Sequence, residues 1–560
     1  MKKQYIFLIV LALLLKSFSH AQEQPGFSPL SLSEALNDNI PLIVITAHDF
    51  TKDIADAEVF QKQGNYPRFA RSFDLNLSLS NSGNWSTLSN GDRVWRLHLK
   101  SNGAIAISLY FEDFFLPEGS TLHVYTPEYK QVSGSYTYLD NQGNELFSTE
   151  FLSGEEQIIE YFEPLSAKGQ GKLRIASLAH QYRTLAMAED CEVNINCSPE
   201  GTNWQDEKKG VVRIIVKEGT QLGYCSGTLI NNTALDCKRY ILTAFHCGTT
   251  ASAADFNGWK FYFNYEAPLC SQGDDIGISN NVFTGCVKKA GSEDNGGSTG
   301  SDFLLVQMNA TTRPSWWTTV YWNGWSRSTS APASGSICIH HPAGSNKKIS
   351  TTTGLSTTST WGGSVLGTHW RVFWTGTTNG WGVTEGGSSG SPLFNTNSQV
   401  VGTLTGGGSY CNSVQPNGQT QADAFGKLSY HWTSNGTTSI RQLKPWLDPI
   451  NSGVTSLNGG FNPCNGVGIQ EVTETEVVTS IYPNPSNGRF TLSVNSGIKE
   501  EVEITTYNFA GQAVMSNRME SSPDGKFILD LTGQPDGLYL IHIKTPAYTQ
   551  TKSLMLFQNK

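Results

Sequence analysis

The sequence is poor in charged residues, and no stretch gathers basic ones into a run. Lys, Arg, Asp and Glu make up 16% of the 560 residues, and the formal net charge is -9. A protein that binds the phosphate backbone of a nucleic acid needs a concentrated basic surface, so we expect no nucleic-acid partner. Long heptad repeats are also missing, which argues against a coiled coil.

Long apolar runs are missing after the N-terminus. A bilayer requires roughly 20 apolar residues, so we expect no membrane span. The first 21 residues instead place Lys2 and Lys3 before an apolar stretch from Tyr5 to Leu15, and the small residues Ser19 and Ala21 stand at the cleavage positions. This is the pattern of a secretory signal peptide cleaved after Ala21, whereas the run is short for the alternative, a membrane anchor.

Cysteine is absent from residues 22–190 and from the last part of the chain. All ten cysteines lie between Cys191 and Cys464. In an exported protein this confinement predicts a disulfide framework in one domain. Zinc is the alternative, but neither a C-x-x-C pair nor an H-E-x-x-H helix is present, so we expect no metal and no cofactor.

The length and the 56 glycines predict several loop-rich, all-β domains. Between Val94 and Phe162 the segments VWRLHLK, AIAISLYF and STLHVYTPE alternate apolar and polar residues, as half-buried strands do. This N-terminal β domain, within 22–189, has no cysteine and no His/Ser/Asp cluster. We expect it to assist folding or to mask the following unit; a binding module is the alternative.

Residues 190–455 hold nearly every Trp and every cysteine but one, and form the predicted working domain. Near its end SIRQLKPWLDP predicts a short helix that packs Leu443 and Trp446 onto the core. A Gly/Asn-rich and then acidic linker, 456–477, follows.

The final unit, 478–560, predicts a compact β-sandwich of short strands separated by Asn, Gly and Pro turns. Its motifs YPNPSNG, NFAGQAV and DGLYLIHI resemble the sorting domain of the type IX secretion system of certain gram-negative bacteria. The resemblance implies the type IX secretion machinery as a partner and export through the periplasm and outer membrane. The mature protein is then secreted or attached to the cell surface.

The string EGGSSGSP, residues 385–392, surrounds Ser389 with Gly387 and Gly390. Glycines permit a sharp turn that presents a nucleophilic hydroxyl, and the N–H groups of Gly387 and Ser389 could stabilise an oxyanion. The alternative is a plain Gly/Ser turn.

Two further strings offer partners for this serine. The apolar strand YILTAFHC ends in His246, and a disulfide from Cys247, for which Cys225 is the natural partner, would fix the loop that aims the imidazole. In GSDFLLVQMN, Asp302 opens an apolar strand, where a buried carboxylate needs partners such as a histidine N–H. A structural histidine and an Asp that caps a turn are the alternatives.

The order His, Asp, Ser is that of chymotrypsin and differs from that of subtilisins and α/β-hydrolases. We therefore predict a triad in which Ser389 attacks a peptide carbonyl, His246 moves the proton and Asp302 orients the imidazole.

The whole of 190–455 resembles the lysyl endopeptidase branch of the trypsin superfamily. The resemblance rests on CxxxxxCSPEG, CSGTLINNTALDCKRYILTAFHC, SDFLLVQMN, IHHPAG, GVTEGGSSGSP and ADAFGKL. It implies a chymotrypsin-like double β-barrel with His246 and Asp302 on the first barrel and Ser389 on the second. Segments VWRLHLKSNG and FFLPEGSTLHVYTP are similar to the family's propeptide, which supports a masking role for 22–189.

The same resemblance implies a set of disulfides. The implied pairs are Cys191 with Cys411, Cys197 with Cys270, and Cys225 with Cys247. It leaves Cys237, Cys286, Cys338 and Cys464 without assigned partners.

The position that holds the cation-binding Asp in trypsin is Val383 here, so a trypsin pocket is not expected. The resemblance instead places the carboxylate at Asp423 and implies cleavage after Lys. It carries substrate binding onto Asp423, Thr405, Gly406 and Trp361. Trp361 matches a family Trp, but the family His that stacks on it is replaced by Thr405.

The predicted function is a secreted serine endopeptidase that acts on proteins or peptides after Lys. A broader Lys/Arg endopeptidase is the alternative within enzymes, and a non-catalytic surface adhesin with a protease fold is the alternative of another class. We expect maturation before Cys191, with Lys172, Arg174 and Arg183 as candidates for self-processing. His340 and His341 are expected to be structural.

Overall fold

The computed structural model describes most of the chain between residues 28 and 557. The described ranges are 28–34, 36, 39–185, 191–271, 281–332, 334–363, 365–411, 417–464, 478–484, 486–494, 502–508, 512–519, 526–544 and 549–557. The expected signal peptide, 1–21, lies outside them. Among these residues no helix is both long and apolar enough to cross a bilayer.

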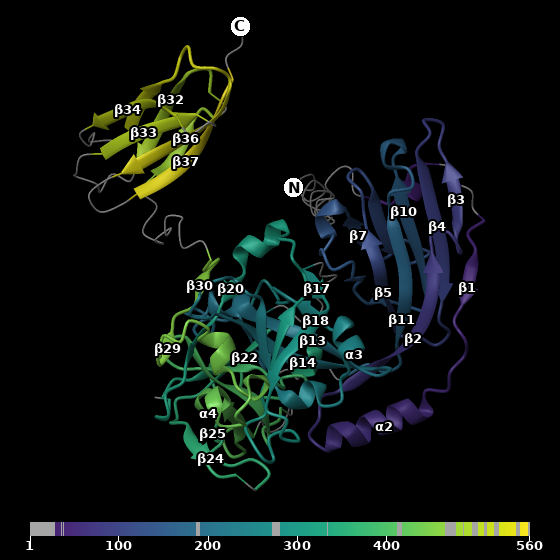
Figure 1. Cartoon of the computed structure of the whole chain (residues 1–560), viewed down its shortest axis with the longest axis vertical. Helices are drawn as coiled ribbons and strands as arrows, with labels where there is room; N and C mark the ends of the chain where they lie inside the picture. Colours follow the sequence, from purple (N-terminus) through teal and green to yellow (C-terminus); the bar gives the residue numbers. More distant parts are fainter. Residues whose placement is uncertain are drawn as a thin grey trace, which may run out of the picture. The chain divides into compact units, whose positions relative to one another are not determined.

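The N-terminal domain packs two β-sheets around one core (Figure 1). One sheet has the order β1-β4-β10-β6-β7 with β3 on β4, and the other has β2-β11-β5 with β8 and β9 on β5. Alternate residues such as Leu97, Leu109 and Ile159 point into this core and are fully buried. The strands are β1 (Leu42–Val44), β2 (Arg68–Ser78), β3 (Asn84–Thr87), β4 (Arg93–Lys100), β5 (Ala106–Phe115), β6 (Thr121–Tyr125), β7 (Val132–Tyr136), β8 (Phe147–Ser148), β9 (Leu152–Ser153), β10 (Glu156–Glu163) and β11 (Lys172–Gln181).

The first sheet of the middle domain runs β17-β16-β13-β14-β15-β19-β18. Its core is aromatic, and Trp259, Phe261 and Phe263 are fully buried there. The strands are β13 (Val211–Glu218), β14 (Gln221–Ile230), β15 (Tyr240–Thr243), β16 (Lys260–Tyr262), β17 (Val282–Thr284), β18 (Cys286–Gly291) and β19 (Leu304–Met308).

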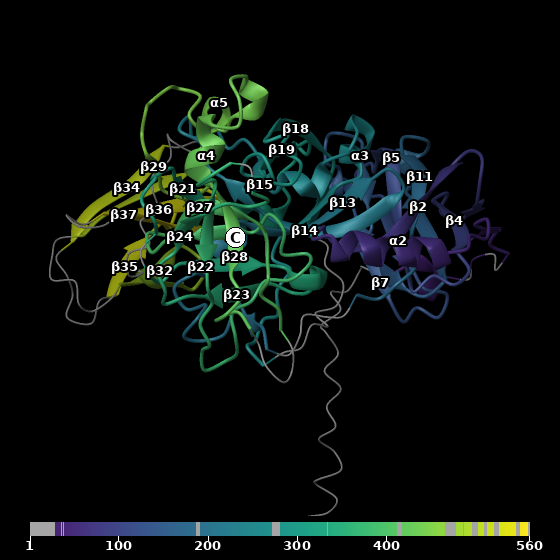
Figure 2. The same ribbon diagram turned by 90° about the horizontal axis from the view of Figure 1, so that it is seen from below.

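The second sheet of this domain runs β23-β22-β26-β27-β28-β25-β24. Figure 2 shows its strands β22, β27 and β28 grouped apart from β13, β14, β18 and β19 of the first sheet. The strands are β22 (Ile337–His340), β23 (Lys348–Thr351), β24 (Thr357–Ser359), β25 (His369–Val372), β26 (Pro392–Phe394), β27 (Gln399–Gly407) and β28 (Asp423–Lys427).

Both sheets pair their strands in the same ring order. With β17 and β18, which only Gly285 separates, counted as one strand, and with the short β24 left out, each sheet joins its first strand to its second and fourth, and its sixth to its third and fifth. This repeated arrangement is that of a chymotrypsin-like double β-barrel. The predicted all-β fold class is therefore confirmed.

Short helices close the second barrel. The structure has α4 (Leu428–Thr433), η8 (Ser439–Arg441) and α5 (Lys444–Leu447). Leu443 is fully buried and Trp446 packs against the same cluster, so the predicted helix packing is confirmed.

The middle domain extends beyond residue 455. We expected 456–464 in the linker, but β29 (Ser456–Leu457) pairs with β21 (Gly324–Ser326), and β30 (Gly460–Phe461) pairs with β20 (Tyr321–Trp322). A disulfide between Cys237 and Cys464 then fixes the end of this segment. The compact unit accordingly ends at Cys464.

The C-terminal unit, 465–560, has its own core. It contains a sheet of order β31-β32-β35 and a sheet of order β34-β33-β36-β37, which together bury residues such as Phe490 and Ile541. The predicted β-sandwich is confirmed. The strands are β31 (Val478–Tyr482), β32 (Arg489–Val494), β33 (Val502–Asn508), β34 (Ala513–Met519), β35 (Lys526–Asp530), β36 (Gly537–Lys544) and β37 (Thr549–Leu556).

Candidate active site

His246 lies on a short 3-10 helix, η5 (Phe245–Gly248), directly after the buried strand β15. The neighbouring Cys247 forms a disulfide with Cys225 of β14, which fixes this turn to the barrel wall. The imidazole is 7% exposed. A strand end tied in this way gives the ring one orientation.

Asp302 precedes β19, the strand that pairs with β15, and is fully buried. One carboxylate oxygen accepts the backbone N–H of His246 at 2.9 Å, and the other accepts the Nδ1–H at 2.7 Å. The backbone of Asp302 has a φ of 57°, and its N–H donates to Oδ2 of Asp294 at 2.7 Å. Two hydrogen bonds to one histidine fix both the position and the tautomer of the imidazole.

Burial of His246 acts to lower its pKa, but Asp302 outweighs burial, so the pKa is raised above its usual value of 6.5. Asp294 and Glu218 add to the increase through their charges. The site therefore stabilises the imidazolium that forms when the ring accepts a proton.

Ser389 lies in the turn before β26, between two glycines with left-handed backbone conformations. The φ angles of Gly387 and Gly390 are 100° and 81°, and a Cβ at Gly390 would lie 2.0 Å from Thr243 Oγ1. The N–H of Ser226 on β14 donates to the carbonyl of Ser389 at 2.8 Å. Only glycine fits this close approach between the turn and the first barrel.

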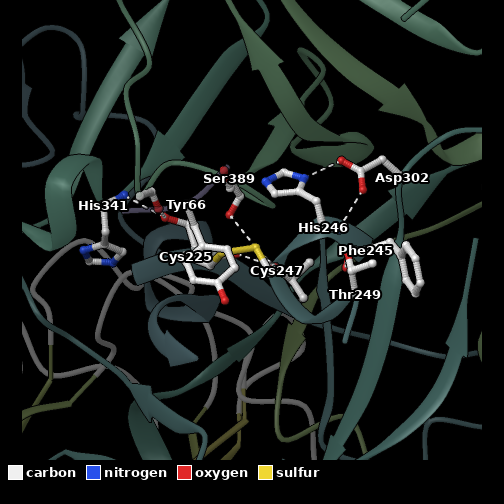
Figure 3. Close-up of a disulfide and its surroundings, with 12 residues drawn as sticks. Tyr66, Cys225, Phe245, His246, Cys247, Thr249, Asp302, His341 and Ser389 are labelled. Carbon is white, nitrogen blue, oxygen red and sulfur yellow. Dashed lines mark hydrogen bonds and ion pairs between the residues drawn. A yellow bond between two sulfur atoms is a disulfide. The ribbon is translucent and has the colours of Figure 1, made fainter. Parts of the chain in front are cut away.

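The three side chains form one arrangement at the seam of the barrels (Figure 3). Asp302 lies at one side of the His246 ring and Ser389 at the other. Nε2 of His246 is buried and has no hydrogen-bond partner within the described residues. The backbone N–H groups of Gly387 and Ser389 likewise have no acceptor in that part of the chain. A base and two donors are thus left for a substrate.

Asp423 lies at the start of β28, opposite Gly407 on β27, and is 1% exposed. Its Oδ2 accepts three hydrogen bonds: from Trp374 Nε1 at 2.6 Å, Thr384 Oγ1 at 2.8 Å and Ser409 Oγ at 2.6 Å. From the residues that the structure describes, its Oδ1 accepts one hydrogen bond, from the N–H of Ser409 at 3.1 Å. Burial raises the pKa of this carboxyl.

No Lys, Arg or His of the described chain forms an ion pair with Asp423. The carboxylate is nevertheless linked to the serine turn, because Thr384 belongs to the same loop and Leu404 of β27 accepts the N–H of Gly390 at 2.8 Å. A buried carboxylate that pairs with no cation of the described chain is therefore hydrogen-bonded to the loop that carries the predicted nucleophile.

Thr405 and Trp361 come together with a histidine that sequence reasoning missed. His369 on β25 is fully buried, its Nε2 lies 3.0 Å from Thr405 Oγ1, and its ring centroid lies 6.4 Å from that of Trp361. Burial lowers its pKa to about 4. A Cβ at Gly406 would lie 3.2 Å from Trp361, so this residue forms part of the same surface.

Thr405 and Trp361 also lie close to Asp302 of the predicted triad. A Cβ at Gly297 would lie 3.2 Å from both Asp302 and Thr405 and 3.1 Å from Trp361, so the three converge there. Asp302 also acts through its charge to raise the pKa of His369. His369 thus brings an imidazole next to Thr405, the position where the sequence resemblance would place a histidine.

The structure pairs the cysteines as the resemblance implies. The bonds are Cys191–Cys411, Cys197–Cys270, Cys225–Cys247 and, in addition, Cys237–Cys464. Cys286 and Cys338 are free and buried. The two thiols belong to different clusters of the core.

His340 supports the serine turn and does not face the other site residues. Its Nδ1 lies 2.7 Å from Ser388 Oγ and its Nε2 lies 3.1 Å from Ser350 Oγ. His341 contacts the carbonyl of Ser345 through Nδ1. Burial lowers the pKa of His340 to about 3 and that of His341 well below 6.5. Both imidazoles are therefore neutral near pH 7, which agrees with a structural role.

Two barrels with a histidine, an aspartate and a serine at their seam define the chymotrypsin-like class of protease folds. Residues 185–426 match the family model described as Lysyl endopeptidase, C-terminal domain. Residues 480–556 match that of the Secretion system C-terminal sorting domain, which indicates a secreted or cell-surface protein. The two resemblances predicted from the motifs are confirmed.

A curated relative, the lysyl endopeptidase of Pseudomonas aeruginosa, is 31% identical over 232 residues, which is 40% of this chain and 46% of the relative. The chain thus spans about half the length of the curated relative it matches. Among solved structures, the protease Anisep from Arthrobacter nicotinovorans is 16% identical with a TM-score of 0.27, covering 39% of this chain and 90% of that one. Human heparin binding protein is 14% identical with a TM-score of 0.27, covering 44% and 94%.

Proposed function

We propose that the chain is the precursor of a secreted serine endopeptidase with His246, Asp302 and Ser389 as its catalytic triad. Ser389 Oγ attacks the carbonyl carbon of the scissile bond while His246 Nε2 accepts the hydroxyl proton and then passes it to the leaving amine. Water next hydrolyses the acyl-enzyme by the same proton route. The observation that carries the proposal is the His246–Asp302 contact with an unpartnered Nε2 on the side of Ser389.

The N–H groups of Gly387 and Ser389 form the oxyanion hole in this proposal. Both lie in the turn held by Ser226, whose hydroxyl donates to the carbonyl of Gly387 at 2.9 Å. The peptides that carry the two donors are fixed through their own carbonyls, because Gly386 O accepts the N–H of Ala343 at 2.7 Å and Ser388 O accepts the N–H of Ser391 at 3.0 Å. Fixed donors need not reorient during the reaction. No metal or organic cofactor is required.

We propose that the enzyme cleaves after Lys because Asp423 receives the substrate cation. Two unit charges 4 Å apart attract by about 4 kcal/mol at an effective dielectric near 20, before desolvation is subtracted. Three donors already occupy Oδ2, which leaves acceptor capacity mainly on Oδ1. A point-like ammonium needs one oxygen, whereas the planar fork of Arg prefers two.

Paired substrates that differ only in Lys or Arg before the scissile bond test this specificity. We expect kcat/KM for the Lys substrate to exceed that for the Arg substrate by at least about tenfold, the factor that corresponds to one lost charge-assisted hydrogen bond. Equal values would support the broader Lys/Arg endopeptidase and end the claim of Lys specificity.

A surface adhesin that retains a protease fold is the alternative of another class. The histidine–aspartate pair with its two hydrogen bonds counts against it, since an adhesin needs no oriented base. Mass spectrometry of a peptide with a single internal Lys separates the two, because only the enzyme yields two products cut at that residue.

In the proposed precursor, 22–189 is the propeptide and 478–560 is the sorting domain for the type IX secretion machinery. Lys172 and Arg174 lie in β11, which pairs with β2 and β5 on its two sides, so neither bond is available to a protease without unfolding the sheet. Arg183 follows the strand. We expect N-terminal sequencing of the mature protein to begin between residues 184 and 191; a start before Arg183 would contradict this.

A further inference from the structure

The propeptide extends the first barrel by one strand beside the active site. The beginning of β2 pairs antiparallel with the beginning of β14, with Arg68 opposite Gly223 and Arg71 opposite Gln221. Just before β2, the carbonyl of Pro67 accepts the N–H of Tyr224 at 3.1 Å. The two domains thus share one continuous sheet.

This added strand reaches the serine turn. A Cβ at Gly386 would lie 3.3 Å from Gln61 Nε2 and 3.4 Å from Pro67 Cδ, so both propeptide residues lie against the loop that carries Ser389. Beyond Tyr224, β14 continues to Ser226, which is bonded to Ser389.

The propeptide strand runs in the chain direction expected for the leaving-group part of a substrate. β14 runs toward Ser389, so the antiparallel segment from Tyr66 to Arg71 has its N-terminal end at the serine and runs away from it. The part of a substrate that follows the scissile bond has this polarity, because its new amino terminus forms at the nucleophile.

The chain before Tyr66 turns away from the site. The N–H of Asn65 donates to the carbonyl of Phe60, and Gly64 has a φ of 86°, which returns the backbone to helix α2 (Thr51–Lys62). The described part of the propeptide therefore places no acyl portion over Ser389. The segment occupies the leaving-group side without offering a bond to cleave.

Tyr66 fills a pocket that the protease forms together with Phe60 of the propeptide, whose ring centroid lies 5.2 Å from that of Tyr66. Its side chain is fully buried in the same cluster as Cys225 and Cys247, and Figure 3 shows its ring at this disulfide, next to His246 and Ser389. Its hydroxyl donates to Oε2 of Glu218 at 2.5 Å. The pocket therefore combines apolar walls with one anionic acceptor at its end.

Glu218 belongs to the protease and stays there after the propeptide leaves. Its Oε1 accepts the N–H of Thr250 at 2.8 Å, which fixes the carboxylate independently of Tyr66. Its charge also reaches His246, whose pKa it helps to raise. Among the described propeptide residues, Oε2 has one further ion pair, with Arg68 at 3.7 Å, and that contact is lost as well when the propeptide leaves.

We propose that the pocket of Tyr66 is the subsite for the residue that directly follows the scissile bond, and that Glu218 makes it select tyrosine. Tyr66 is the last residue before the chain turns away, and it lies where the leaving amine must receive its proton from His246. This inference rests on the proposed endopeptidase function and adds its leaving-group specificity. In the precursor the same contact blocks the site.

Acyl transfer to added amines tests the subsite in the matured protein obtained from the secreted full chain. An N-blocked lysine ester acylates Ser389 and releases its alcohol. The nitrogen of an amino-acid amide then attacks the acyl carbon, His246 takes the amine proton and returns it to the departing Ser389 Oγ, and a new amide bond forms. Water competes and gives the acid, so the ratio of the two products measures the binding of each amine.

We expect tyrosinamide to capture the acyl group about tenfold better than phenylalaninamide, the factor for a hydrogen bond to a charged acceptor, and alaninamide to be the poorest. In Glu218→Ala the preference for tyrosinamide over phenylalaninamide should vanish. Glu207→Ala, which removes a buried glutamate of η4 (Glu207–Gly210), is the control and should retain it. Equal capture of tyrosinamide and phenylalaninamide by the wild type would overturn the subsite, whereas no turnover of the ester would overturn the endopeptidase proposal itself.

The precursor supplies a second readout that does not need the mature enzyme. In the intact full chain, Tyr66→Phe should speed the labelling of Ser389 by a fluorophosphonate, since the hydrogen bond that holds the blocking strand is lost. Tyr161→Phe removes a buried hydroxyl whose partners in the described part of the chain are Ser120 and Glu163, both in the propeptide, and should label as slowly as the wild type. Equal labelling rates for all three would contradict the blocking role of Tyr66.

Discussion

Asp302 is the residue at which a single substitution should change the proposed chemistry most. In Asp302→Asn the imidazole loses both its orientation and the charge that raises its pKa, so we expect kcat to fall by about 10⁴-fold. His246 must be neutral to act as a base, so activity is lost as the pH falls through its pKa. The acid limb of the residual kcat/KM profile should therefore move to lower pH, and a move to higher pH would contradict the assigned role.

Asp423 permits a separate test of specificity. Asp423→Asn keeps the shape of the pocket but removes its charge, so kcat/KM for a Lys substrate should fall by about 100-fold or more, given about 4 kcal/mol of attraction before desolvation. A norleucine substrate of the same length carries no charge and is the control. If both substrates lose activity equally, Asp423 is structural.

Local strings identified His246, Asp302 and Ser389 because each lies at the end of a strand or between glycines, where the sequence itself is unusual. His369 gave no such signal. It lies within THWRV, and the pairing of β25 with β28 and of β28 with β27 brings it to Thr405. A contact that depends on sheet register between distant strands cannot be seen in one stretch of sequence.

The turn between Thr384 and β26 is the element on which the site depends. Gly390→Ala would place a Cβ 2.0 Å from Thr243 Oγ1 at a φ of 81°, and should destabilise the protein by more than about 1 kcal/mol. Gly363→Ala has the same backbone penalty, with a φ of 94°, but nothing within 4 Å of the added atom. Denaturant unfolding of the two variants separates the clash from the conformational penalty; equal losses would show that no clash exists.

Alternation predicted strands of the N-terminal domain between Val94 and Phe162, but neither β2 itself nor its pairing. Its burial pattern changes along the strand because β11 of the propeptide pairs with it from Ala70 to Ser78, whereas β14 of the protease pairs only with its first residues, Arg68 to Arg71. Helix α2 escaped sequence reasoning because only Asp53 and Ala57 of its residues are buried, so it has no apolar stripe.

Association of the two N-terminal domains should depend on pH through Lys260. This protease side chain is fully buried and donates to Ser108 Oγ at 2.6 Å and to the carbonyl of Thr149 at 2.8 Å, both in the propeptide. Burial lowers its pKa from 10.5 to about 7. Between these values association releases a proton, so it should tighten as the pH rises and weaken as the pH falls, levelling off below about 7.

The measurement is the fraction of cleaved propeptide that remains bound to the protease between pH 7 and pH 10, the window set by these pKa values. Lys260→Met keeps the apolar stem without the charge and should remove most of the dependence. A wild-type complex that loosens as the pH rises through this window would contradict the assignment to Lys260.

The order of the domains along the whole chain could be predicted, since composition and cysteine usage change sharply between them. The end of the protease domain could not. Residues 456–464 are rich in Gly and Asn and have few apolar anchors, yet they pair with β20 and β21 and end in the Cys237–Cys464 bond. Here backbone pairing and a crosslink replace side-chain burial, and composition does not reveal either.

Labelling of the mature protein with a fluorophosphonate, followed by mass spectrometry of the modified peptide, tests the triad most directly. The account predicts one label, on Ser389, that is abolished in Ser389→Ala and strongly slowed in His246→Ala. Ser388→Ala is the matched control and should still be labelled, because Ser388 is bonded to His340 and not to the triad. A wild-type protein that folds but takes no label at Ser389 would contradict the account.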